Sequence, residues 1–279
     1  MLKGMKAKRQ LAAFVALAVG GALAGMPTAQ AAQNTTVGTS GTQSGISGTG
    51  TTTNPYTDIV GTNLMNGSVT DNTLTIGVLN AGNIPVVNGT VSAGGTATTT
   101  NAVTGNTLVI DSISLTGNAY GGIGANIAQT SGAAQTNPNV VKMNGGTVTG
   151  AVIGAGSIAG GATNGGVELT GGTVTAGSDG IAIAGGMGKT SAINNSVTIT
   201  AGTVTGNVYG GYSENSGAKT TGNNVYLGDA SGNYSANLSG VALYGGNDSS
   251  DNTNNHLHVR AKNITADAAR NFSTYDFHL

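Results

Sequence analysis

Residues 145–156 read GGTVTGAVIGAG, and closely similar phrases begin at Gly171 and Ala201, at successive spacings of 26 and 30 residues. A self-similar unit of this length is typical of solenoids, in which each copy stacks on its neighbours. An alternating apolar and polar run precedes each copy, and glycine, asparagine and serine separate the runs. This pattern indicates short strands joined by turns. We therefore expect an all-β fold, a right-handed parallel β-helix of about six irregular coils.

The triplet Thr-Val-Thr predicts which side chains face the core. Side chains alternate between the two faces of a strand, so Val148, Val174 and Val204 should form an inward ladder with the flanking threonines outside. The run after each triplet adds further positions to the expected interior, namely Val152, Ile181 or Ile183, and Val208.

Pairs of glycines follow these runs and are expected to turn the backbone at the corners of the coil. Glycine adopts positive φ without strain, which we expect at Gly185–Gly186, Gly210–Gly211 and Gly245–Gly246. Irregular inserts between the repeats should project as loops. Two such inserts are residues 127–139 and the stretch from Tyr212 to Asn223.

The N-terminus has the pattern of a secretory signal. Four cations within residues 1–10 precede the apolar run LAAFVALAVGGALAGM, and small residues at Ala29 and Ala31 fit cleavage after Ala31 or Ala32. We expect a signal peptide over residues 1–31, a flexible leader rich in glycine, serine and threonine over 32–55, and the β-solenoid repeat region over 56–279. The chain should therefore be exported through the inner membrane.

The composition argues against several classes of function. Cysteine is absent, so the chain has neither a disulfide framework nor a thiolate nucleophile. Without the predicted signal peptide, six cations remain against eleven acids, and these cations are not clustered. Nucleic acid is not an expected partner, because binding to phosphates needs grouped lysine and arginine side chains.

The repeat region resembles a known family of surface proteins. The phrases SVTITAGTVTGNVYGGYS, NVYLG and VALYGGN are similar to the passenger repeats of bacterial autotransporter adhesins. The resemblance implies type V secretion and a β-helix at the cell surface, associated with the outer membrane or secreted. It also implies a translocator barrel, and no run of ten-residue alternating strands with aromatic girdles is encoded in this chain. We therefore expect the chain to be the N-terminal part of a longer product.

The acidic residues and histidines are the candidates for catalysis or metal binding. His256 and His258 lie on one face of an expected strand and could turn two imidazoles toward a metal, but no third ligand follows from the sequence. Asp179 is expected to close a local turn. The other carboxylates fall in separate repeats, as at Asp111 and Glu168. No catalytic residue, metal ligand or cofactor is therefore expected, and we do not expect an enzyme.

The predicted function is that of an adhesin-like passenger, with binding loops on a repetitive scaffold. The partner would be a protein or glycan of a host-cell, matrix or bacterial surface. Two alternatives remain, a β-helical enzyme acting on polysaccharides and a structural or ice-binding solenoid with threonine ladders. Amphipathic rings suit contact with such partners, and they concentrate in the last third of the chain. The candidate binding residues are Tyr209, Tyr212, Tyr226, Tyr234 and Tyr244.

Overall fold

The structure is a computed structural model. It describes residues 29–30, 34–37, 52–53, 55–64, 68–77, 83–96, 102–124, 137–247 and 251–278. Residues 1–28 of the predicted signal peptide, most of the predicted leader and most of the insert at 127–139 lie outside these ranges. The signal peptide and its cleavage site therefore stay predictions.

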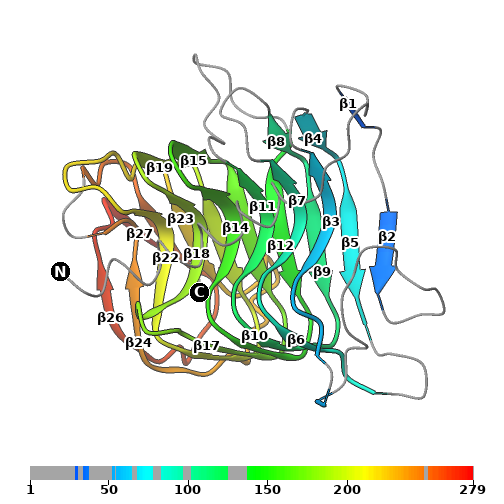
Figure 1. Cartoon of the computed structure of the whole chain (residues 1–279). Coiled ribbons are helices and arrows are strands. Elements are labelled where there is room, and N and C mark those ends of the chain that lie inside the picture. The colour runs from blue at the N-terminus through cyan, green and yellow to red at the C-terminus, as the bar shows by residue number, and fades with distance from the viewer. Residues whose placement is uncertain are drawn as a thin grey trace.

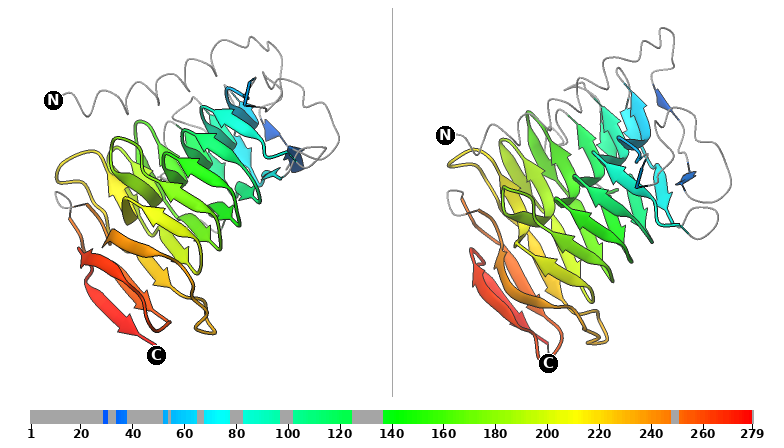
Figure 2. Two further views of the ribbon diagram at one scale, coloured as in Figure 1. Left: turned by 90° about the horizontal axis from the view of Figure 1, so that it is seen from below. Right: turned by 60° about the horizontal axis from the view of Figure 1, so that its bottom comes forward.

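The described chain forms a parallel β-solenoid, as the repeats predict (Figures 1 and 2). Each coil passes through three long sheets, and every strand pair within the described ranges is parallel. Sheet 1 is the nine-stranded sheet. Its strands are β2 (Asn34–Val37), β5 (Thr73–Ile76), β9 (Thr107–Ile110), β12 (Asn139–Met143), β16 (Gly165–Leu169), β20 (Ser196–Ile199), β23 (Asn224–Leu227), β25 (His256–Val259) and β27 (Thr274–Phe277).

Sheets 2 and 3 complete the coil. Sheet 2 contains β6 (Val86–Asn88), β10 (Ser114–Thr116), β13 (Thr147–Thr149), β17 (Thr173–Thr175) and β21 (Thr203–Thr205). Sheet 3 contains β3 (Ile59–Leu64), β7 (Val91–Thr96), β11 (Ala119–Gly124), β14 (Val152–Ser157), β18 (Ile181–Gly188), β22 (Asn207–Ser213), β24 (Leu238–Tyr244) and β26 (Ala266–Arg270).

Two narrow strips of short strands lie on the fourth side. One is formed by β1 (Ala29–Gln30), β4 (Ser68–Thr70) and β8 (Val103–Thr104), and the other by β15 (Gly161–Thr163) and β19 (Ser191–Ile193). Strands β1 and β2 fall within the segments predicted as signal peptide and leader. In the described part of the chain, no helix has the length and apolar character needed to cross a membrane.

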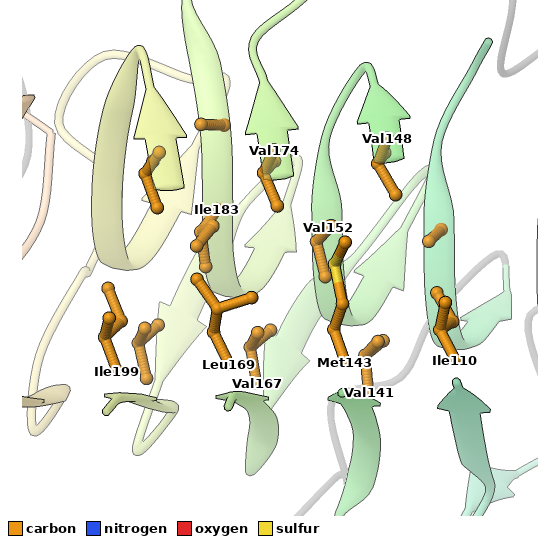
Figure 3. Close-up of a cluster of buried hydrophobic side chains, with 14 of the residues drawn as sticks. Ile110, Val141, Met143, Val148, Val152, Val167, Leu169, Val174, Ile183 and Ile199 are labelled. Atoms are coloured by element: carbon orange, nitrogen blue, oxygen red, sulfur yellow. The ribbon is translucent and has the colours of Figure 1, made fainter. Parts of the chain in front are cut away.

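The inward ladder is confirmed. Val148, Val174 and Val204 occupy the same register position in adjacent strands of sheet 2, and all three are buried. Figure 3 shows Val148 and Val174 facing side chains of sheet 1 across the interior. Of the two alternatives in the next run, Ile183 points inward, because it pairs with Val152 and Val208 and packs in the main core. Stacking of this kind buries aliphatic area without any need for disulfides.

The expectation of positive φ at the glycine pairs is wrong. None of the six glycines has a positive φ. Their backbone is instead approached closely by another part of the coil. A β-carbon on Gly186 would lie under 3.0 Å from Asn195, and one on Gly211 would lie equally close to Asn223. The pairs are thus needed for space and not for backbone conformation.

An asparagine ladder explains this close approach. In most coils, a buried asparagine precedes sheet 1 or begins it, and its Nδ2 donates to Oδ1 of the asparagine in the next coil at 2.8 to 3.1 Å. The same Oδ1 atoms accept backbone N–H groups, so one side chain satisfies several buried polar groups. The ladder consists of Asn72, Asn106 and Asn139, followed after one gap by Asn195, Asn223 and Asn255.

In the coil that lacks the ladder asparagine, a side chain of sheet 3 occupies the space. Gly165 takes the asparagine position, and Ala155 of sheet 3 stands in the register column that holds Gly122 and Gly186 in the adjacent coils. A β-carbon on Gly165 would lie under 3.0 Å from the Ala155 methyl group. From the coil of Gly94 to that of Gly211, each coil therefore carries a side chain from only one of the two sides, an amide from sheet 1 or a methyl from sheet 3.

The insert from Tyr212 to Asn223 is only partly a projecting loop. Residues 214–217 are exposed. The following segment is built into the coil, because Lys219 forms bridges with Ser191 and Asp251 on its two sides. The surface that this insert offers to a partner is thus smaller than the sequence indicates.

Candidate binding surfaces

The five candidate tyrosines do not form one site. Tyr209, Tyr212 and Tyr244 lie on the outer face of sheet 3, Tyr226 lies on the outer face of sheet 1, and Tyr234 lies in the segment between β23 and β24. The structure therefore brings together three of the five and separates the other two from them.

The sheet 3 group is a packed cluster. Tyr209 stacks on Tyr244 with ring centroids 4.7 Å apart and meets Tyr212 edge to face at 5.1 Å. They point away from the core, since inward Val208 directly precedes Tyr209 in the strand. Tyr209 is only 9% exposed, and burial raises the pKa of the partly buried Tyr212. These rings present little of their area for contact with a ligand.

The sheet 1 group is more accessible and includes a cation. Tyr226 stacks on His258 with centroids 4.4 Å apart, and the guanidinium of Arg260 lies 4.4 Å from the centre of the Tyr226 ring. Nδ1 of His258 lies 3.3 Å from Oδ2 of Asp276, and its Nε2 lies 3.1 Å from Oδ1 of Asn224. The imidazole is thus held in one orientation on three sides.

Two effects oppose each other at His258. Burial lowers the pKa of the imidazole, and the Asp276 carboxylate raises it. The charge of Arg260 and the nearby rings of His256 and His278 lower it further. The net direction is downward. Desolvation and the adjacent positive charge of Arg260 act together against a single carboxylate that is itself partly exposed.

A pocket lies where three consecutive strands of sheet 1 end. Its walls come from the turn after β23 and from the residues that follow β25 and β27. The cavity volume is about 670 Å³, which falls within the range of small-molecule sites. The lining residues are Ala230, Ser231, Gly232, Tyr234, Arg260, Ala261, Lys262 and His278.

The turn that forms one wall is held by Asp229. The carboxylate accepts hydrogen bonds from the Asn233 side chain at 2.7 Å and from the backbone N–H groups of Asn233 and Ser231 at 2.8 Å. These bonds, that of the Asn233 side chain first, lower the pKa of Asp229. The carboxylate is thus bound within its own turn, and it forms no ion pair with the described cations of the pocket.

The other polar candidates are placed as follows. His256 and His258 do share one face, with centroids 5.9 Å apart, but no group of three or more possible metal ligands occurs among the described residues. Asp179 closes its local turn, since its Oδ1 accepts the N–H of Ile181 at 3.1 Å. Asp111 accepts a bond from Asn144, and Glu168 pairs with Lys142.

Sequence reasoning missed Arg260, Lys262 and His278 as members of a site. Arg260 and Lys262 appear in the sequence as two isolated cations that follow an apolar strand. His278 comes from the next coil and joins them only through the parallel pairing of β25 with β27. The one available signal was the i, i+2 spacing of the two cations just beyond a strand end.

Comparison of the chain with protein-family models, with curated proteins and with solved structures found no match. The fold and the pocket are therefore interpreted from their own geometry.

Proposed function

We propose that the chain is a non-enzymatic binding protein, an adhesin-like passenger that is exported and displayed at the cell surface. The observation that carries the proposal is the pocket at the end of sheet 1, where a tyrosine and two cations from adjacent coils surround a cavity of about 670 Å³. A rigid repetitive scaffold that carries such a site is suited to presenting it to a partner.

The arrangement of the acidic groups supports binding over catalysis. A polysaccharide-cleaving enzyme needs carboxylates or other groups convergent on one bond. Asp111 and Asp229 lie in other coils than Glu168 and Asp179, which are separated by β17 within one coil. Each of the four already has a partner in its own surroundings. The resemblance of the repeats to autotransporter passengers supports export and surface display.

The experiment is an attachment assay with the folded chain coupled to beads. We expect the beads to attach to at least one of three surfaces, epithelial cells, extracellular matrix or bacterial cells. Beads carrying the heat-unfolded chain provide the matched control, since they have the same composition without the sites. Attachment no better than that of bare beads on all three surfaces would contradict the proposal.

A second candidate function rests on sheet 2. Its outward threonines form two columns in register, Thr147 with Thr173 and Thr203, and Thr149 with Thr175 and Thr205. Such columns could order water at an ice surface. Thermal hysteresis of the folded chain in freezing solutions would support this candidate, and its absence at high protein concentration would remove it.

A further inference from the structure

We propose that the pocket formed by Tyr234, Arg260, Lys262 and His278 binds an acidic saccharide, a sugar that carries a carboxylate. This inference deepens the proposed function by naming the class of ligand and the residues that recognise it. It rests on three observations, namely the unpaired cations, the orientation of Arg260 and an unsatisfied hydroxyl group.

The cations of the pocket have no acidic partner. In the described part of the chain, no carboxylate lies within 4.0 Å of Arg260 or Lys262. Asp229 belongs to the adjoining turn but is engaged there by three hydrogen bonds. The mature chain is expected to be acidic, so a cavity with two free cations is a local exception, and it favours an anionic ligand.

Arg260 is held in position for planar recognition. Its guanidinium stacks over the Tyr226 ring at 4.4 Å, and Tyr226 in turn stacks on His258. This contact restrains the guanidinium, whose N–H groups form no ion pair with a described carboxylate. A guanidinium edge matches a carboxylate through two parallel hydrogen bonds. Lys262 adds a second, flexible positive charge on the same cavity.

Tyr234 supplies a group that suits the hydroxyls of a sugar. Its hydroxyl oxygen is buried and has no hydrogen-bond partner, and the ring packs partly against the core. The oxygen has almost no accessible surface, so a ligand reaches it only after a small shift of the pocket wall. Because a buried hydroxyl without a partner is costly, its satisfaction by a ligand then gains free energy. Burial also raises the pKa of Tyr234, which keeps the hydroxyl protonated and able to donate. A simple anion would use the cations, whereas a saccharide would use both the cations and this hydroxyl.

The test is calorimetric titration of the full chain with a hyaluronan tetrasaccharide, which alternates glucuronate with a neutral sugar. The methyl ester of the same tetrasaccharide is the ligand control, because it has the same rings without the charge. We expect the acid to bind and the ester to bind at least about tenfold more weakly, since one charge-assisted contact contributes about 1.4 kcal/mol or more. Equal affinity for the two would overturn the proposal, as would no binding of the acid.

Three variants locate the site. Arg260→Gln and Lys262→Gln should each weaken binding at least about fivefold, and Tyr234→Phe should weaken it by a smaller factor. Arg270→Gln is the matched control, because Arg270 is an exposed arginine of sheet 3 outside the pocket lining. Circular dichroism checks that each variant keeps the solenoid, and exposed Lys262 gives a variant with little risk to folding. An equal loss in Arg270→Gln would show a diffuse charge effect and overturn the assignment.

Competition by inorganic phosphate separates a saccharide site from a simple anion site. We expect phosphate to compete far less well than the tetrasaccharide, and competition at equal concentration would overturn the proposal. The attachment assay distinguishes the two proposals. Beads that attach while the tetrasaccharide does not bind would leave the proposed function standing and the ligand class wrong. Binding of the tetrasaccharide without any attachment would contradict surface adhesion alone.

Discussion

The inner and outer faces of sheet 1 are formed by alternate residues of the same strands. They differ in how much the side-chain type changes from one coil to the next. One inward register column is aliphatic in coil after coil, and consists of Leu74, Leu108, Val141, Val167, Val197, Val225 and Leu257. The outward column beside it changes along the axis, and contains Lys142, Glu168, Thr198, Tyr226 and His258. The inner face is constrained by stacking, because every side chain there touches the same position in two other coils. The outer face is open to solvent, so side chains of different size and charge fit there, and recognition can develop on it in one coil without a change in the others.

Breaking the inward constraint should produce the largest effect. Val174→Asp places a carboxylate between Val148 and Val204, where no described polar group can pair with it. Burial of an unpaired charge is among the most destabilising changes known. We expect a loss of about 4 kcal/mol or more in the free energy of unfolding, measured by denaturant titration. Thr149→Asp, an exposed position in the same sheet, should cost less than about 1 kcal/mol. Equal effects in the two variants would show that this register is wrong.

The close approach of Gly186 to Asn195 of the asparagine ladder allows a second test, of whether sheet 1 and sheet 3 compete for the same space. Gly186→Ala introduces a methyl group against Asn195, and Asn195→Gly removes the amide that its neighbours need. Each change alone should destabilise the fold by about 2 kcal/mol. The double variant reproduces the pairing of Ala155 with Gly165 that the protein already uses one coil earlier.

The double variant should therefore cost less than the sum of the two single changes, with a coupling free energy of about 1 kcal/mol or more in a double-mutant cycle. Gly188→Ala in place of Gly186→Ala gives a control, since its β-carbon would meet Ser191 and Ala162 and not the ladder. If the losses in free energy of unfolding at Gly186 and Asn195 simply add, the two side-chain positions do not compete for the same space.

The sequence predicts the parts of this molecule that depend on local alternation. The period of two in Thr-Val-Thr identifies the inward valines correctly, because a strand alternates its faces whatever surrounds it. The asparagine ladder escaped prediction, since single asparagines are also common in turns and the spacing between Asn195 and Asn223 differs from that between Asn223 and Asn255. The glycine pairs were misinterpreted for the same reason, because their partner is a side chain of another part of the coil.

The candidate site shows the same division between local and non-local information. Of the candidate tyrosines, Tyr234 lines the proposed pocket and Tyr226 lies beside it, against Arg260. The sequence alone does not distinguish Tyr226 and Tyr234 from Tyr209 and Tyr244, which lie on the outer face of sheet 3. Residues of successive coils become neighbours through register, and register depends on where each turn ends.

The smallest expected effect concerns the pH dependence contributed by the outer face at His258. The folded-state pKa of this imidazole is lower than its ordinary value of 6.5, first because of burial. The folded chain therefore binds fewer protons than the unfolded chain in the interval between the two values. The contribution of the neutral His258 imidazole to the free energy of unfolding is fully present above the unfolded-state pKa of 6.5. It is lost as the pH falls through the lower folded-state pKa. Denaturation midpoints at pH 8 and pH 5 should thus differ less in His258→Gln than in the unmodified chain. A larger difference in the variant would mean that the bond to Asp276 outweighs burial, and that this outer column stabilises the fold more in its charged form.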